Sequence, residues 1–318
     1  MAFDLLPAAR LDMGYLSLPP SPGTASQVPE VLVPAMRAGL GVRLLPGVGG
    51  RVMLGVLPAE GARQGIGLRE ASLDWEPGAN WQFSGGQIRL PWQEQEDLTS
   101  FGQWFPGGLM ASSGLLEPSG LGVKVGWGWD REAGTTAGLE VAAVASEGWL
   151  GGTGSREGPL LPGWWGRGPA VHGRLRGRAP WAGTWALGAR YNLADDQQAM
   201  AMGQGVVGPW SWHVSAGAST SASLSSQMVA QTEWRWWWTG DASPQATGSW
   251  LVLAARGLRD GEMTGQATPS FEIGLGIGTA PDDHVHAMTG LSWRRRPDSE
   301  ESELWWRSTL TWRLREDD

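Results

Sequence analysis

The chain of 318 residues contains 18% charged residues, carries a formal net charge of -8 and has no cysteine. Without cysteine there is no disulfide scaffold, thiolate metal site or cysteine nucleophile, and the acidic balance argues against a nucleic-acid partner, which needs a concentrated basic face. The four histidines show none of the spacings of zinc sites, so we expect neither a metal nor a cofactor. No run of eighteen apolar residues occurs, so no transmembrane helix is expected.

Apolar and polar residues alternate along much of the chain. Between residues 36 and 44, the even positions are Met, Ala, Leu, Val and Leu, and the odd positions are Arg and Gly. The same alternation returns at 121–129, 181–191, 271–277 and 304–314. Successive side chains of a β-strand point to opposite faces, so each segment is predicted to be a strand with one apolar and one polar face.

Turn residues divide the chain into about sixteen such strands. In chain order they are expected at 8–18, 31–45, 49–57, 67–76, 80–92, 119–130, 134–146, 168–179, 181–194, 197–207, 209–220, 224–239, 247–258, 270–279, 284–296 and 303–315. More than half of the chain would then be strand, well above the ~20–25% of ordinary soluble domains. A barrel or a propeller could accommodate this, but no four-stranded blade repeat is present.

Short and long connections between these strands alternate. The short ones lie near 46–48, 77–79, 131–133, 180, 208–209 and 280–283, and the long ones include 19–30, 58–66, 93–118, 147–167 and 259–269. Outer-membrane barrels have tight turns on one rim and longer loops on the other. Because a lipid-facing sheet cannot leave backbone groups unpaired, it must close. We therefore predict an all-β fold, a single domain of residues 1–318 that forms a closed antiparallel transmembrane β-barrel of about 16 strands.

The tryptophans support a membrane setting. Codon usage in a GC-rich genome could explain their number, 22, but not their positions. They fall near strand ends in two groups, as expected of amphipathic indole rings at the two membrane interfaces. In the cluster 234–238, the even-numbered rings belong to this girdle and Trp237 faces the lumen. The predicted girdle consists of Trp75, Trp81, Trp127, Trp129, Trp210, Trp212, Trp234, Trp236 and Trp312 near short turns, and of Trp293 and Trp306 near long loops.

Three ordered motifs lie in the first part of the chain. They are Met-Arg-Ala-Gly-Leu at 36–40, Leu-Arg-Glu-Ala-Ser-Leu-Asp-Trp at 68–75 and Gly-Gln-Ile-Arg-Leu-Pro-Trp at 86–92. In order and spacing they resemble the phosphate-selective (polyphosphate) porin family of Gram-negative outer membranes. The resemblance implies a sixteen-stranded, trimeric porin whose third outer loop folds into the lumen as a constriction, and residues 93–118 occupy that place.

The chain differs from this family at two features that concern phosphate binding. The chain has a single lysine, Lys124, where the family has a lysine cluster. The expected constriction loop begins with the acidic residues Glu94, Glu96 and Asp97, which would repel phosphate. Phosphate specificity is therefore not expected to carry over.

With the polar face of each strand turned inward, cations outnumber carboxylates in the expected lumen. Because rings of charge set ion preference, weak anion preference is one hypothesis. The other is that pairs of arginines and carboxylates only keep the wall wet and rigid. The predicted pore-lining residues are Arg37, Arg43, Gln87, Arg89, Lys124, Arg174, Arg176, Arg190, Arg235, Arg307 and Arg313.

The sequence thus predicts a porin of the bacterial outer membrane, a passive diffusion channel for small polar solutes or ions. The expected partners are the lipid bilayer and either a homotrimer or other envelope proteins. The alternative is a structural, porin-like barrel that anchors a multiprotein envelope or surface complex and has a plugged, non-conducting lumen. No catalytic residue is expected, because the chain has no G-x-S-x-G motif and the side chains of Ser211 and His213, which are two apart on one face, need not meet.

Overall fold

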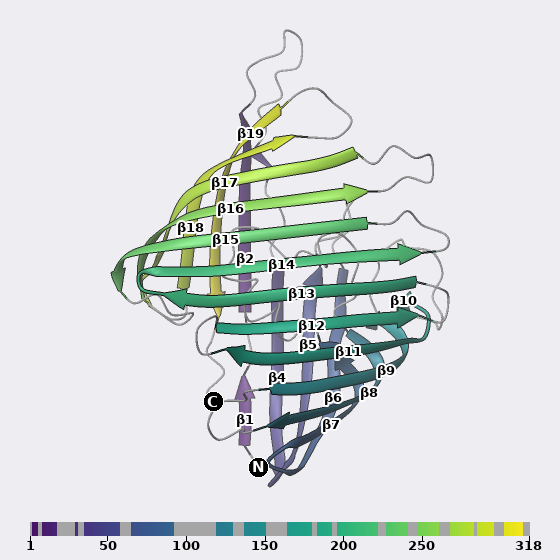
Figure 1. The fold of residues 1–318 in the computed structure, drawn as a ribbon. Coiled ribbons are helices and arrows are strands. Elements are labelled where there is room, and N and C mark those ends of the chain that lie inside the picture. Colours follow the sequence, from purple (N-terminus) through teal and green to yellow (C-terminus); the bar gives the residue numbers. More distant parts are fainter. Residues whose placement is uncertain are drawn as a thin grey trace.

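In the computed structural model, the described part of the chain forms one antiparallel sheet of nineteen strands (Figure 1). The structure describes residues 2–5, 8–17, 29–30, 35–57, 65–91, 119–129, 137–150, 164–179, 183–192, 196–221, 227–240, 247–260, 268–282, 285–295 and 302–313. Among these residues, none forms a helix with the length and apolar character needed to cross a bilayer.

The strands of the described residues are numbered in chain order. Their bounds are β1 Ala2–Leu5, β2 Ala8–Ser17, β3 Pro29–Glu30, β4 Ala35–Leu45, β5 Val48–Leu57, β6 Gly65–Gly78, β7 Trp81–Arg89, β8 Ser119–Trp129, β9 Ala137–Leu150, β10 Trp164–Arg167, β11 Ala170–Ala179, β12 Gly183–Asn192, β13 Asp196–Val207, β14 Trp210–Ser221, β15 Gln227–Gly240, β16 Gly248–Asp260, β17 Thr268–Ala280, β18 Val285–Arg295 and β19 Ser302–Arg313.

Each of the sixteen expected strands has a counterpart in the structure. Three short strands, β1, β3 and β10, were not expected. β9 runs to Leu150, four residues beyond the expected end, and β7 ends at Arg89, three residues before it. The early end of β7 has a structural cause, because Leu90 follows the strand and packs with Ile88 on Ala142, Val144 and Ala170 of β9 and β11.

Most strand pairings join neighbours along the chain. They run in chain order from β4 to β9, pass from β9 to β11, and continue in chain order to β19. β19 then pairs with β2, from Leu304↔Ser17 to Arg313↔Ala8, and β2 pairs with β4 at Ala8↔Arg37. Besides the three short strands, sixteen of the nineteen strands take part in these pairings.

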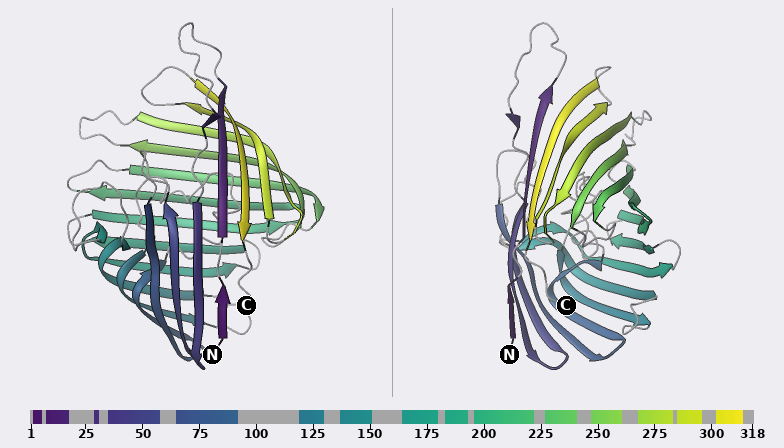
Figure 2. Two further views of the ribbon diagram at one scale, coloured as in Figure 1. Left: turned by 180° about the vertical axis from the view of Figure 1, so that it is seen from behind. Right: turned by 90° about the vertical axis from the view of Figure 1, so that its left-hand side faces the viewer.

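The strands of opposite walls cross in projection. In Figure 1, β12 to β16 run across the view in front of the steep strands β2, β4 and β5. In the side view of Figure 2, β2 stands opposite the central strands, which are coloured teal and green. Strands that are all tilted in the same sense around a cylinder produce this crossing.

Burial alternates along the strands with the apolar residues on the outside. In β17, Phe271, Ile273, Leu275 and Ile277 are 37–60% exposed, whereas the intervening Glu272 is buried. The same holds for β9, where Leu139 and Val141 are exposed and Glu140 is buried. A water-soluble domain buries its large apolar side chains and exposes its charges. This sheet has the reverse distribution, with an apolar outer face and a polar inner wall.

Candidate functional site

The inner wall carries a buried cluster of charges where β9 and β11 pair. Arg174 and Glu140 are register partners, and Arg174 Nη2 lies 2.6 Å from both carboxylate oxygens of Glu140. Arg176 Nη2 lies 3.4 Å from Glu140 Oε1. The side chain of Arg174 is 1% exposed, but that of Arg176 is 44% exposed. One carboxylate therefore serves two guanidinium groups, and the excess positive charge faces water at Arg176.

Two further arginines of the inner wall are also paired. Arg235 Nε donates a hydrogen bond of 2.7 Å to Glu233 Oε1 on the same strand and face. Arg256 and Glu272 are register partners on β16 and β17, with 3.0 Å between Nη2 and Oε2. These pairs have the arrangement expected if the charges mainly stabilise a polar wall.

An aromatic cluster covers the inner wall of β15 and β16. The rings of Trp237 and Trp250, which are register partners, lie 4.5 Å apart between centroids, and Trp237 Nε1 donates a hydrogen bond of 3.0 Å to Ser211 Oγ. The Arg235 guanidinium carbon lies 5.4 Å from the Trp250 ring centroid. Trp250 also covers Gly278, where a Cβ would lie 2.3 Å from the ring atom Cε2. A glycine on β17 therefore makes room for a large ring on β16.

Sequence reasoning expected Trp237 on this face, and it is 5% exposed. It missed Trp250, which is 0% exposed. The signal was available, because exposed Leu251 and Leu253 alternate with Trp250 and Val252 along β16. The parity of the strand alone places Trp250 inside.

The ends of β7 and β8 turn into the sheet's interior. We call Gln87–Pro91 together with Ser119 and Gly120 the inward shelf; all of these residues are buried. Outside the shelf, β6 and β9 approach each other and pair at Leu68↔Leu150, past the ends of β7 and β8. The wall is thus continued behind the shelf, and the shelf lies on its inner side.

Apolar packing holds the shelf against the inner wall. Ile88 and Leu90 form a buried cluster with Ala142, Val144 and Ala170, which belong to β9 and β11. Each of these five side chains is less than 5% exposed. β8 separates β7 from β9 in the sheet, so this contact requires β7 to leave its place in the wall.

Irregular backbone permits this turn. The register of β5 with β6 shifts between Met53 and Leu54, and that of β8 with β9 shifts between Leu121 and Gly122. Gly86 has φ 117°, and a Cβ at this position would lie 2.4 Å from the carbonyl oxygen of Ala71. Positive φ and this close approach both require glycine where β7 bends.

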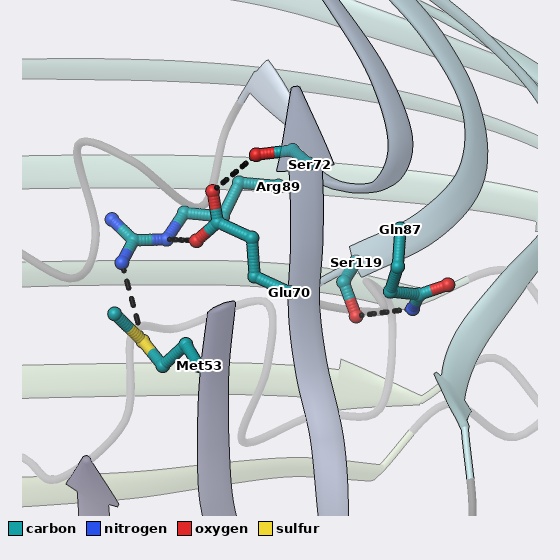
Figure 3. A network of polar contacts seen from close by, with 6 residues as sticks. All are labelled: Met53, Glu70, Ser72, Gln87, Arg89 and Ser119. Atoms are coloured by element: carbon teal, nitrogen blue, oxygen red, sulfur yellow. Dashed lines mark hydrogen bonds and ion pairs between the residues drawn. The ribbon is translucent and has the colours of Figure 1, made fainter. Parts of the chain in front are cut away.

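A polar network surrounds the root of the shelf (Figure 3). Arg89 Nε lies 2.9 Å from Glu70 Oε2, and Arg89 Nη2 lies 3.3 Å from Met53 Sδ. Ser72 Oγ donates a hydrogen bond of 3.2 Å to Glu70 Oε1. On the other side, Gln87 Nε2 donates a hydrogen bond of 3.1 Å to Ser119 Oγ.

A polar cavity of about 40 Å³ adjoins this network. Its lining includes the cations Arg51, Arg89 and Lys124 and the carboxylates Glu70 and Asp74. Arg51 was missed as an inner-wall residue, although its alternation with exposed Val52 and Leu54 identifies its face. The cavity therefore brings together charges from β5, β6, β7 and β8.

The structure separates the predicted pore-lining residues into groups. Arg89, Lys124, Arg174 and Arg190 are buried, Gln87 lies in the inward shelf, Arg235 is partly buried, and Arg43 and Arg176 are exposed. Arg37, Arg307 and Arg313 lie in the described strands β4 and β19, but their side chains fall outside the described part. Glu94, Glu96 and Asp97, like the whole expected loop 93–118, lie outside the described residues.

Several of the predicted girdle tryptophans meet across strands next to short connections. Ring centroids are 6.1 Å apart for Trp81 and Trp127, and 6.4 Å apart both for Trp210 with Trp236 and for Trp212 with Trp234. The exposed members are Trp75, Trp81, Trp210, Trp234, Trp236, Trp293, Trp306 and Trp312. Trp127 and Trp212 are half-buried, and the side chain of Trp129 is outside the described part.

Comparison with known proteins finds similarity in fold alone. No family model and no curated protein matches the chain. Among solved structures, OmpF of Salmonella typhi in complex with daunomycin has a TM-score of 0.67 at 9% identity, covering 98% of this chain and 97% of that one. The outer membrane channel DcaP of Acinetobacter baumannii has a TM-score of 0.59 at 12% identity, with 98% and 97% coverage.

An anion-selective porin from Comamonas acidovorans is similar to the same degree. Its TM-score is 0.59 at 10% identity, and the match covers 98% of this chain and 99% of that one. The shared fold is thus that of outer-membrane porins and channels in general. The narrower resemblance to phosphate-selective porins stays a prediction.

Proposed function

We propose that this chain is an outer-membrane porin of a Gram-negative bacterium, a passive diffusion channel for small polar solutes or ions. The observation that carries the proposal is the reversed distribution of side chains, apolar outside and charged inside. Exposed apolar surface that surrounds a whole sheet would be a serious aggregation hazard in water. In a bilayer the same surface faces hydrocarbon, and the polar wall faces an aqueous lumen.

In this proposal the single domain of residues 1–318 is a closed barrel of sixteen strands. The pairings of β2 with β19 and, at residues 8–10, with β4 support closure, because a strand edge in lipid needs a partner. The exposed tryptophans at strand ends form the interfacial girdle. A barrel of about this many strands is wide enough to hold water.

The constriction is proposed to lie at the inward shelf. Its two arms are the described flanks of residues 93–118, and both are buried against the inner wall. A constriction loop must begin and end on the inner side of the wall, and the shelf lies there. Glu94, Glu96 and Asp97 would then add negative charge to the passage.

Conductance tests the proposal directly. The purified protein, refolded in detergent and added to planar lipid bilayers, should produce stepwise increases in current of uniform size. Heat-unfolded protein at the same concentration is the control. Absence of steps from protein that is shown to be folded and inserted would reject the channel.

A weak anion preference is proposed on the strength of Arg176. Glu140 neutralises only one of its two arginine neighbours, and Arg176 is the one exposed to water. Arg176→Gln should therefore lower the ratio of chloride to potassium permeability, because fixed charge at the passage sets the local ion concentration. The reversal potential in a tenfold KCl gradient measures this ratio. Arg295→Gln, an exposed arginine at the outward end of β18, is the control, and equal shifts in the two variants would contradict the assignment.

The alternative function, a structural barrel that anchors an envelope or surface complex, has one observation in its favour. His172, Arg174, Arg190 and Gln198 on the inner wall are all 0–4% exposed. A wide open channel would leave such side chains in water. An envelope protein that copurifies with folded, non-conducting barrels would favour this alternative, whereas copurification of identical copies alone would fit a porin homotrimer.

No enzymatic activity is proposed. The Ser211 hydroxyl accepts a hydrogen bond from Trp237 Nε1, so it is part of the aromatic cluster on the inner wall. Within the described part of the chain, no group of three or more His, Asp or Glu side chains could hold a metal ion.

A further inference from the structure

We propose that Glu70 is a positioning residue that holds the inward shelf against the inner wall and thereby sets the width of the channel. The inference rests on the proposed porin function and adds a residue to it. Its basis is the contrast between two kinds of contact at the shelf, which are apolar packing at its tip and one buried ion pair at its root.

The apolar contacts would tolerate several positions of the shelf. Ile88 and Leu90 pack on Ala142, Val144 and Ala170. These apolar side chains form no hydrogen bonds. The hydrophobic contribution is non-directional and follows the apolar area removed from water. Packing alone therefore does not define one place for the shelf.

The ion pair at the root is buried. Arg89 is 7% exposed and the Glu70 side chain is 6% exposed, so both charges are removed from water. Ser72 Oγ donates to the second oxygen of Glu70, which orients the carboxylate toward Arg89 Nε. A buried guanidinium that loses its carboxylate is strongly destabilised, and it regains solvation only by moving toward water. Arg89 belongs to β7 at the root of the shelf, so its movement takes the shelf with it.

The wall behind the shelf does not depend on this pair. Leu68 and Leu150 join β6 and β9 outside the shelf, and the β5–β6 and β8–β9 pairings continue on either side. Loss of the ion pair is therefore expected to release the shelf without opening the sheet. This distinguishes Glu70 from a residue that is needed for folding alone.

Cysteine labelling tests the position of the shelf. The chain has no cysteine of its own, so a single introduced thiol reports on one site. Leu90 is 1% exposed, and Leu90→Cys should react slowly with a charged maleimide in the folded protein. Adding Glu70→Gln should raise the labelling rate at least about tenfold, because the rate follows the population of the open form. The matched control is Glu272→Gln, which removes the carboxylate of another inner-wall pair and should leave the Leu90→Cys rate unchanged.

A double variant separates charge from packing. Glu70→Gln with Arg89→Met removes both charges of the pair, so the labelling rate should return toward that of Leu90→Cys alone. Pro281 lies in an exposed turn. Pro281→Cys therefore gives the labelling rate of an accessible cysteine, and it is measured in combination with each variant. An unchanged rate in Glu70→Gln, or an equally fast rate in the double variant, would overturn the proposal.

Conductance completes the test. The Glu70→Gln variant should give current steps that differ in size from those of the wild type, whereas Glu272→Gln should not. Faster labelling with unchanged steps would overturn the claim that the shelf sets the width. Labelling is measured in detergent and needs no current, so a wild type that does not conduct would reject the porin function while the labelling result still decides the role of Glu70.

Discussion

Replacing Leu275 with arginine should lower the free energy of unfolding from lipid vesicles by about 2–4 kcal/mol, or abolish insertion. Leu275 lies near the middle of β17 and is 60% exposed on the outer face. Its register partners Leu253 and Leu291 are each 51% exposed. A guanidinium group at this height would enter the hydrocarbon core, where neither water nor a carboxylate compensates its charge.

A second arginine substitution on the same strand separates the effect of its position in the membrane from the effect of introducing an arginine. Thr279 is exposed on the same face, but it lies beside the short connection that follows β17. Thr279→Arg should cost only ~0–1 kcal/mol, because the penalty falls toward the membrane interface. Urea titration of both variants in vesicles measures the difference. Equal losses, or a Leu275→Arg variant that is more soluble and equally stable in water, would mean that the apolar face is not covered by lipid.

Replacing Glu140 with alanine should be the most damaging single change on the inner wall, with an expected loss of about 3–5 kcal/mol. Arg174 is buried and lies 2.6 Å from both oxygens of this carboxylate. Its charge would stay inside the wall without this counter-ion. Arg176 would lose the same partner, but its exposed side chain can be solvated, so its contribution should be small.

The burial of the paired arginine decides how much stability is lost when its carboxylate is removed. In the pair Arg256–Glu272, the arginine is 23% exposed, so Glu272→Ala should cost only about 1 kcal/mol. Guanidinium titration of the folded barrel in detergent gives both values. The double variant Glu140→Gln with Arg174→Met should recover most of the stability, since no buried charge remains. A Glu140→Ala variant as stable as Glu272→Ala would show that Arg174 is solvated in the folded protein.

The strands and their faces could be predicted from the sequence, because alternation of side chains is a property of each strand by itself. All sixteen expected strands are present, including the weakly patterned β5 and β13. Trp237 was assigned to the inner face from its position among Trp234 and Trp236, and the same parity would have identified Trp250 and Arg51.

The inward shelf could not be predicted in this way. Alternation continues to Arg89 in the sequence, and nothing local indicates that Ile88, near the end of β7, and Leu90 pack on Ala142. Next to the shelf, Leu68 pairs with Leu150, which lies far from it in the chain. Such pairings follow from the path of the whole sheet, and no short segment records them.

The sequence by itself determined the fold class, the approximate number of strands and the side of each strand that carries charge, because these follow from a period of two within single segments. Only the tertiary structure decided which charges are buried. His172, Arg174 and Arg176 share one face of β11, yet the first two are at most 1% exposed and the Arg176 side chain is 44% exposed. The difference depends on contacts with other strands, such as the carboxylate of Glu140 on β9, which lies 2.6 Å from Arg174 and 3.4 Å from Arg176.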